Sequence, residues 1–296
     1  MSGAALLLGG TGRLGRALAA VLRERGVPFA APGRSEVDLA ATDRLAEIIG
    51  RIAPGVVLNA AAFTDVAGCE APEIRDAVFR INAGAPEALA RACDRLAIPL
   101  VHVSTDYVFD GDGRVPYRET DDPHPIQVYG ASKLAGEQAV LAAASSSLVV
   151  RVSTVFGPWV PERPAYPDAI LRQARTSARI EVAARPVASP TFTIDAAEAI
   201  VDLWRAGASG VVHVVNDGAC SRLELARAVV EEAGFAPPVV VDERNDPPGA
   251  LRRPAYSVLD TARLETILGR RLRPWRDALR CYLEMIGAKA PSSGPP

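Results

Sequence analysis

The 296-residue sequence has 49% hydrophobic and 23% charged residues, a globular composition that excludes a disordered, collagen-like or fibrous chain. Its 33 basic and 35 acidic residues give a formal net charge of −2, so neither a nucleic acid nor an acidic membrane surface is expected as its partner. The four cysteines are scattered, without C-x-x-C or histidines at metal-ligand spacing, which predicts reduced thiols and no metal site. No apolar run approaches the roughly 18 residues of a membrane helix, and the first residues lack the basic region and long apolar run of a signal peptide, so we expect a cytoplasmic protein.

Short apolar runs alternate with amphipathic stretches over the first half of the chain. The run at residues 4–8 ends in two glycines and is followed by a helical stripe at 13–25. Further strands are expected at 27–31, 56–58, 100–103 and 148–152, and further helices at 42–52, 73–96 and 127–143. This alternation predicts βαβ units and therefore an α/β fold with a Rossmann-type, doubly wound parallel sheet.

Beyond residue 157 the pattern weakens and prolines and arginines become frequent. Helices are expected at 195–205, 221–233, 261–268 and 275–286, and a strand at 211–215. We therefore expect a dinucleotide-binding domain at 1–157 whose sheet is rejoined by 191–215, and a smaller C-terminal substrate-binding lobe from 158–190 and 216–287. Residues 288–296 have the composition of a disordered tail.

Three glycines, Gly9, Gly12 and Gly15, lie in G-x-x-G-x-x-G spacing between the first predicted strand and the first helix. Glycines permit a tight turn and let backbone amides approach a pyrophosphate at the positive end of a helix. The bare pattern is also compatible with a plain strand-to-helix turn. Its position between strand and helix favours dinucleotide binding.

The residues after the second predicted strand bear on the choice of dinucleotide. An acidic residue there favours a free ribose 2′-hydroxyl, whereas an arginine favours a 2′-phosphate. This chain has Arg34 and Ser35 before any acidic residue, which favours NADPH. An arginine that is merely exposed on a loop is the alternative, and NADH then remains open as cofactor.

Tyr129 and Lys133 are four residues apart in a predicted helix and therefore share one of its faces. With six tyrosines and two lysines in the chain, about 0.04 such pairs are expected by chance. A nearby ammonium lowers the pKa of a phenol, so Tyr129 is a candidate proton donor to a carbonyl. Thr105 follows a predicted strand at the sheet edge where ligands bind, and its hydroxyl is a candidate to polarise that carbonyl. A surface pair and a local turn are the alternatives.

These motifs also carry a family resemblance. The glycine loop, Asn59-Ala60-Ala61-Ala62, Ser104 to Gly111 and Tyr129-Gly130-x-Ser132-Lys133 resemble the extended short-chain dehydrogenase/reductases. Together with Ser189-Pro190-Thr191 and Arg253-Pro254-x-x-Ser257-x-Leu259, they are similar to the dTDP-4-dehydrorhamnose reductase family. The matching motifs extend from residue 9 to about residue 259.

The resemblance implies NADPH-dependent reduction of the 4-keto group of a nucleoside-diphosphate 4-keto-6-deoxy sugar. Thr105, Tyr129 and Lys133 would be the catalytic trio, with Tyr129 giving the proton and Lys133 binding the nicotinamide ribose and tuning Tyr129. Tyr107 would contact the sugar, and Asn82 is either a support for the lysine or an ordinary helix residue. The candidate cofactor-binding residues are Gly9, Thr11, Gly12, Arg13, Leu14, Gly15, Arg34, Ser35, Asp38, Leu39, Ala60, Ala61, Ala62, Tyr129 and Lys133.

The candidate substrate-binding residues are Thr105, Tyr107, Tyr129, Thr154, Trp159 and Arg253. The sequence departs from the family at Thr154, where a tryptophan is usual, and in the loop at 185–191. Both segments belong to the sugar side of the cleft in the family, so the identity of the sugar stays open. Either Trp159 replaces the missing aromatic wall, or the pocket is wider.

Other functions remain open at this point. Another extended-family enzyme, such as a 4-epimerase or a dehydratase, is one alternative, and Asp106 is the acid that a dehydratase would want beside Thr105. A non-catalytic NAD(P)-binding regulatory subunit is another. His102 and His213 lie on apolar strands and are expected to be core residues. The resemblance allows a homodimer, and no metal ligand set is apparent in the sequence.

Overall fold

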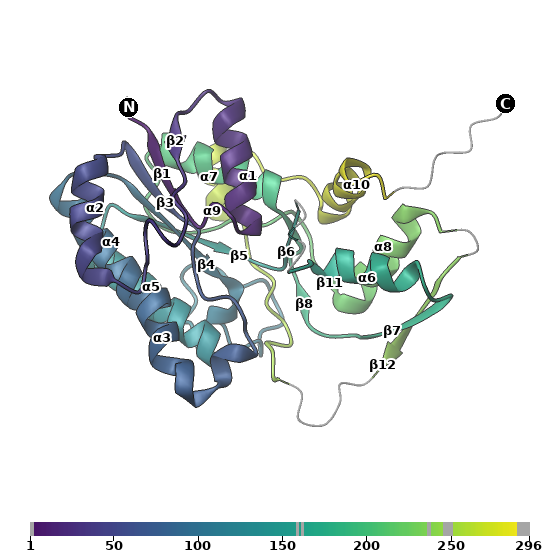
Figure 1. Cartoon of the computed structure of the whole chain (residues 1–296). Helices are drawn as coiled ribbons and strands as arrows, with labels where there is room; N and C mark the ends of the chain where they lie inside the picture. The colour runs from purple at the N-terminus through teal and green to yellow at the C-terminus, as the bar shows by residue number, and fades with distance from the viewer. Residues whose placement is uncertain (1–2, 158–159, 161–162, 236–237, 245–250, 289–296) are drawn as a thin grey trace.

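The computed structural model describes residues 3–157, 160, 163–235, 238–244 and 251–288, and its centre is a six-stranded parallel sheet (Figure 1). The strand order is β10-β5-β4-β3-β1-β2. The strands are β1 (Ala5–Leu8), β2 (Phe29–Ala30), β3 (Val56–Asn59), β4 (Leu100–Thr105), β5 (Leu148–Val152) and β10 (Gly210–His213). The predicted Rossmann-type α/β fold is thus confirmed.

Helices cover both faces of this sheet, which is why its strands are continuous apolar runs. One face carries α1 (Arg13–Glu24), α7 (Thr193–Arg205) and α9 (Ala262–Leu268), and the other carries α2 (Leu45–Ile52), α4 (Ala85–Arg95) and α5 (Val128–Ala143). Along β1, Leu7 packs into the first core, whereas Leu6 and Leu8 pack into the second. This follows from the two-residue period of a strand.

The helical region predicted at 73–96 consists of three pieces. It contains α3 (Arg75–Phe79), a π-helical turn at Arg80–Gly84 and α4. The π-helical turn thus interrupts the α-helical hydrogen bonding up to Gly84. Such single π turns occur frequently at functional sites, and the buried Asn82 lies within this one.

A second, smaller lobe lies beside the sheet and has a core of its own (Figure 1). It contains α6 (Tyr166–Ala174), α8 (Arg222–Ala233), α10 (Trp275–Met285) and the parallel pair β7 (Arg179–Ala183) and β12 (Val240–Arg244). Two short pairs, β6 (Val155–Phe156) with β9 (Thr191–Phe192) and β8 (Val187–Ala188) with β11 (Cys220–Ser221), complete the connections. The sequence pattern did not predict α6 or these short strands. The expected tail falls, except for Ala288, outside the described residues.

The strand order reverses direction at β1, because β2 lies on one side of it and β3 on the other. In open α/β sheets, the carboxyl ends of the strands at such a switch point form the ligand crevice. Here the chain after β1 passes directly against the chain after β3, since a Cβ on Gly9 would lie 2.6 Å from the backbone nitrogen of Ala61.

In the part of the chain that is described, no helix is long and apolar enough to cross a membrane.

Candidate active site

The glycine loop connects β1 to α1 with very little space for side chains. Gly9 has a φ of +80°, and its carbonyl accepts a hydrogen bond from the Gly12 N–H at 3.0 Å. A Cβ on Gly15 would lie 2.0 Å from the Gly9 carbonyl oxygen, which is closer than any non-bonded contact allows. Glycine at these positions therefore lets helix and strand approach as dinucleotide-binding loops require.

The amino end of α1 is open to an anionic group. Gly12 is its N-cap, no side chain caps it, and its first turn contains no acidic residue. Thr11 and Gly12 are exposed, so the first N–H groups of the helix and its positive dipole end face a negatively charged ligand. A dinucleotide pyrophosphate fits this site, because the loop has no Cβ atoms at Gly9, Gly12 and Gly15 that would fill it.

Arg13 and Leu14 differ from the rest of the loop in where they point. Leu14 is buried in the core beneath α1. The Arg13 guanidinium reaches across to the lobe, where it donates to the carbonyl of Gly157 at 3.2 Å and lies 3.6 Å from the carboxylate of Asp168. The side chains of Arg13 and Leu14 are therefore engaged elsewhere, and only their backbone N–H groups can contact a pyrophosphate.

The candidate ribose-binding residues lie on the loop after β2. The Arg34 side chain is 81% exposed and lies 3.8 Å from the Asp38 carboxylate, and Ser35 is exposed as well. Leu39 packs against the core, and Ala60, Ala61 and Ala62 are half-buried after β3. The structure thus keeps Arg34 accessible to a ligand at this edge of the sheet.

Thr105 and Tyr129 meet at the carboxyl end of β4. Tyr129 is in the first turn of α5, and the Thr105 hydroxyl lies close enough to its phenol to act on the pKa of that group. The close approach depends on Gly130, because a Cβ there would lie 2.1 Å from the Tyr107 carbonyl oxygen. The Tyr107 ring packs edge-on against Tyr129 with centroids 5.9 Å apart. Burial raises the pKa of the Tyr129 phenol, so it keeps its proton at neutral pH.

Asp106 is a buried carboxylate directly behind this pair. It accepts hydrogen bonds from the hydroxyls of Thr105 at 3.1 Å, Ser153 at 2.8 Å and Ser257 at 2.6 Å. Burial raises its pKa to about 6, although the three hydroxyl bonds pull in the opposite direction. The Thr105 hydroxyl oxygen in turn accepts a hydrogen bond from the Tyr107 N–H at 3.2 Å. Sequence reasoning named Asp106 only as a possible dehydratase acid and did not find this network.

Lys133 does not point where the sequence suggested. Its ammonium nitrogen donates to the Val103 carbonyl at 2.6 Å and lies 3.3 Å from Nε2 of His102, beneath the sheet edge. Burial lowers the pKa of Lys133 to about 8. In this arrangement the lysine side chain turns towards β4, and burial has the largest effect on the pKa of the Tyr129 phenol. The role of Lys133 in tuning Tyr129 stays a prediction.

The Asn82 side chain connects the loop after β3 to α5. Its side-chain amide accepts from the Phe63 N–H at 2.7 Å and donates to the Phe63 carbonyl and the Ser132 hydroxyl, both at 3.0 Å. The residue is fully buried. It therefore ties the loop after β3 to α5 one residue before Lys133, which is more than the ordinary helix position that the sequence left open.

The expected sugar side of the site contains Tyr107 and arginines from the lobe. Arg253 and Arg222 lie near the Tyr107 phenol, and their charges partly offset the rise that burial causes in its pKa. Thr154 is exposed and has a φ of +40°, an uncommon backbone conformation for a threonine. Trp159 lies outside the described residues.

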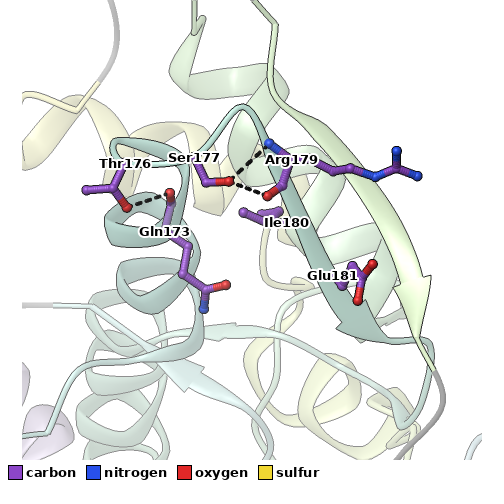
Figure 2. Close-up of a pocket in the computed structure, with 6 residues that line it drawn as sticks. All are labelled: Gln173, Thr176, Ser177, Arg179, Ile180 and Glu181. Carbon is purple, nitrogen blue, oxygen red and sulfur yellow. Dashed lines mark hydrogen bonds between the residues drawn. The ribbon is translucent and has the colours of Figure 1, made fainter.

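A separate surface hollow lies on the lobe, between the end of α6 and β7 (Figure 2). Its polar groups bond locally: the Thr176 hydroxyl contacts the Gln173 carbonyl at 3.2 Å, and the Ser177 hydroxyl accepts from the Arg179 N–H at 3.2 Å. These hydroxyl groups are thus hydrogen-bonded within the turn that follows α6. The hollow contains none of the candidate site residues. Among the described residues, no group of three or more His, Cys, Asp or Glu side chains is arranged to hold a metal ion.

Comparison with known proteins covers nearly the whole chain. The sequence profile of the RmlD substrate binding domain matches residues 3–287. A dTDP-4-dehydrorhamnose reductase from Mycobacterium tuberculosis is 40% identical over 285 residues, covering 94% of this chain and 91% of the relative. A dTDP-4-keto-6-deoxy-D-glucose reductase from Streptomyces niveus is 35% identical, covering 96% and 97%. The solved structure of a dTDP-4-dehydrorhamnose reductase from Bacillus anthracis, in complex with NADP, is similar with a TM-score of 0.88 and 28% identity, covering 96% and 100%.

Proposed function

The chain belongs to the RmlD substrate-binding domain family, and we propose that it reduces the 4-keto group of a dTDP-linked 4-keto-6-deoxy sugar with NADPH. It is an oxidoreductase of deoxysugar biosynthesis. The observation that carries the proposal is the contact of Tyr129 with Thr105 at the carboxyl edge of the sheet. This contact lies in a chain whose relatives are named for the same reduction.

Different residues of this chain would bind the cofactor and donate the proton. The open amino end of α1 would hold the pyrophosphate of NADPH, and the accessible Arg34 would hold its 2′-phosphate. When bound, NADPH supplies the hydride for the carbonyl carbon. Tyr129 keeps its proton at neutral pH and would donate it to the carbonyl oxygen, which becomes the new hydroxyl.

Thr105 would orient this transfer. In the ligand-free arrangement the Thr105 hydroxyl donates to Asp106, accepts from the Tyr107 N–H and lies beside the Tyr129 phenol. A substrate carbonyl that displaces this contact would meet the phenol proton directly. The Asp106 carboxylate is only 2% exposed and engaged by three hydroxyls, which argues against its service as the acid of a dehydratase.

The arginines around Tyr107 would bind the nucleoside diphosphate. Arg222 is at the start of α8 and Arg253 precedes the segment that carries Ser257, so both come from outside the sheet. Guanidinium groups bind phosphate oxygens in a fork geometry. We therefore assign residues 1–157 and 191–215 to dinucleotide binding and residues 158–190 and 216–287 to the sugar nucleotide, a division supported by the separate core of the lobe.

The test is NADPH oxidation by the purified protein with a panel of dTDP- and GDP-linked 4-keto-6-deoxy sugars. We expect turnover with a dTDP-linked sugar and stoichiometric formation of the 4-hydroxy product. Conversion without net oxidation of NADPH would instead indicate an epimerase. The cytoplasmic location and the homodimer stay predictions, and light scattering of the purified protein measures the second.

A further inference from the structure

Three buried side chains form a line beneath the candidate active site. Asn59 ends β3, His102 lies in the middle of β4, and Lys133 reaches them from α5. Their exposed fractions are 1%, 0% and 2%. Nδ2 of Asn59 lies 3.1 Å from Nδ1 of His102, and Nε2 of His102 lies 3.3 Å from Nζ of Lys133. The proposed mechanism uses neither Asn59 nor His102.

The hydrogen bonds of Asn59 determine the tautomer of His102. The Ala61 N–H donates to Oδ1 of Asn59 at 3.2 Å. Because a backbone N–H only donates, the carboxamide oxygen must face Ala61 and the NH₂ group must face His102. Nδ1 of His102 is therefore an acceptor and carries no proton. Burial lowers the pKa of His102 well below its ordinary value, so the ring is neutral and its one proton is on Nε2.

This tautomer directs an N–H group at Lys133. An ammonium has three donors and no acceptor, so it repels a facing N–H, whereas a neutral amine accepts from it through its lone pair. The neutral amine can still donate to the Val103 carbonyl at 2.6 Å. We propose that Asn59 and His102 are positioning residues that weaken the hold of Lys133 on its proton. This inference rests on the proposed function for its catalytic meaning.

Burial is the main cause of the lowered pKa of Lys133, and the charged groups around it do not add to that effect. Glu137, one turn further along α5, raises the pKa of Lys133, but its carboxylate is paired with Arg151 of β5 at 2.7 Å. Arg151 in turn lies 3.4 Å from His213 of β10. Asp106 and Cys69 act on the pKa of Tyr129, and neither is among the causes that shift the pKa of Lys133. The π-helical turn contributes the uncharged Asn82, which engages Ser132.

A lysine that titrates near neutral pH suits the proposed reduction. Each turnover takes one proton from Tyr129 and leaves a phenolate. The phenolate must regain a proton from solvent, and a group on the same helix face that exchanges its proton near neutral pH would favour that return. With a pKa of about 8, Lys133 can both release and recover the proton at neutral pH.

The chain offers a direct measurement, because Lys133 and Lys289 are its only lysines. Protein labelled with [13Cε]lysine gives two signals, and the Lys289→Arg background leaves Lys133 alone. In the ligand-free protein we expect the Lys133 signal to titrate near pH 8, against about 10.4 for an ordinary lysine. His102→Gln presents a carbonyl oxygen to Lys133 and should raise its pKa by about one unit or more, a tenfold change in proton affinity.

Two further samples make the test specific. Asn59→Asp keeps the imidazole but places a hydrogen-bond acceptor at Nδ1. The imidazole proton then lies on Nδ1 and Nε2 becomes an acceptor, so the pKa of Lys133 should rise again. His213→Gln is the matched control, since His213 is equally buried but bonds to Asp260 and Arg151 instead of Lys133. The Lys133 titration should stay near its wild-type value in this control. The alkaline limb of the kcat profile should shift upward in the first two variants only.

Two titration results for Lys133 would contradict the proposed role of Asn59 and His102. A wild-type Lys133 that titrates near 10.4, or a folded His102→Gln protein that titrates as wild type does, would overturn it. If the variants do not fold, 15N spectra of the three wild-type histidines decide, because a proton on Nδ1 of His102 contradicts the argument and a proton on Nε2 supports it. These readouts need no substrate. A protein that fails to reduce any sugar while Lys133 titrates near 8 would refute the proposed function and leave this inference standing.

Discussion

Replacing Asp106 by asparagine should change how the stability of the protein depends on pH. The folded-state pKa of Asp106 is about 6, above the ordinary value of 3.8, because burial penalises its charge. The folded state therefore holds the proton more tightly than the unfolded state does. Asp106 contributes stability that is fully present below the unfolded pKa and is lost as the pH rises through the folded pKa.

The magnitude follows from the two pKa values. A gap of about 2 pKa units corresponds to about 3 kcal/mol, of which about 2 kcal/mol develops between about pH 4.5 and about pH 7.5. Asp106→Asn lacks this dependence. Its unfolding free energy minus that of the wild type should rise by about 2 kcal/mol over the same interval.

Urea unfolding of both proteins at several pH values in this range measures the difference. Asp94→Asn, on the exposed end of α4, is the control, and its difference from the wild type should stay constant. A difference for Asp106→Asn that is flat or falls with rising pH would show that the three hydroxyl donors outweigh burial. The carboxylate would then be stabilised in its charged form, contrary to the argument.

Three other predictions concern the candidate site. Tyr129→Phe should lower kcat about 10²- to 10⁴-fold while leaving the Kd for NADPH unchanged, because only the proton donor is lost. A variant that keeps more than about a tenth of the wild-type kcat excludes Tyr129 as the acid. Arg34→Asp should reverse the preference for NADPH over NADH, measured as the ratio of kcat/KM values, since a carboxylate repels the 2′-phosphate. Gly15→Ala should abolish NADPH binding in titration calorimetry or unfold the protein, because the new Cβ would lie 2.0 Å from the Gly9 carbonyl oxygen. Gly50→Ala, in the interior of α2 with open space around it, is its control and should stabilise the protein by about 0.5–1 kcal/mol.

Much of the sheet half of the molecule could be predicted from local sequence. The run at residues 5–8 is apolar at every position because both faces of the sheet are covered, and the helix from Arg13 shows its buried stripe plainly. The glycine loop and the pair Tyr129 and Lys133 are recognisable because their functional spacing lies within one turn or one loop. The lobe was less predictable, since β7 and β12 pair across about 60 intervening residues and neither strand is marked by its own pattern.

The sequence by itself therefore determined the fold class, the family and the residues at the carboxyl edge of the sheet, because periodicity and short motifs are local properties of the chain. Only the tertiary structure decided what surrounds them. Asp106 meets Ser153 and Ser257 across 47 and 151 residues, and Lys133 meets His102 across 31. Such contacts depend on strand order and on how deeply each side chain is buried. For this reason the proton affinities of Asp106, Tyr129 and Lys133, which burial shifts away from their ordinary values, could not be obtained from spacing alone.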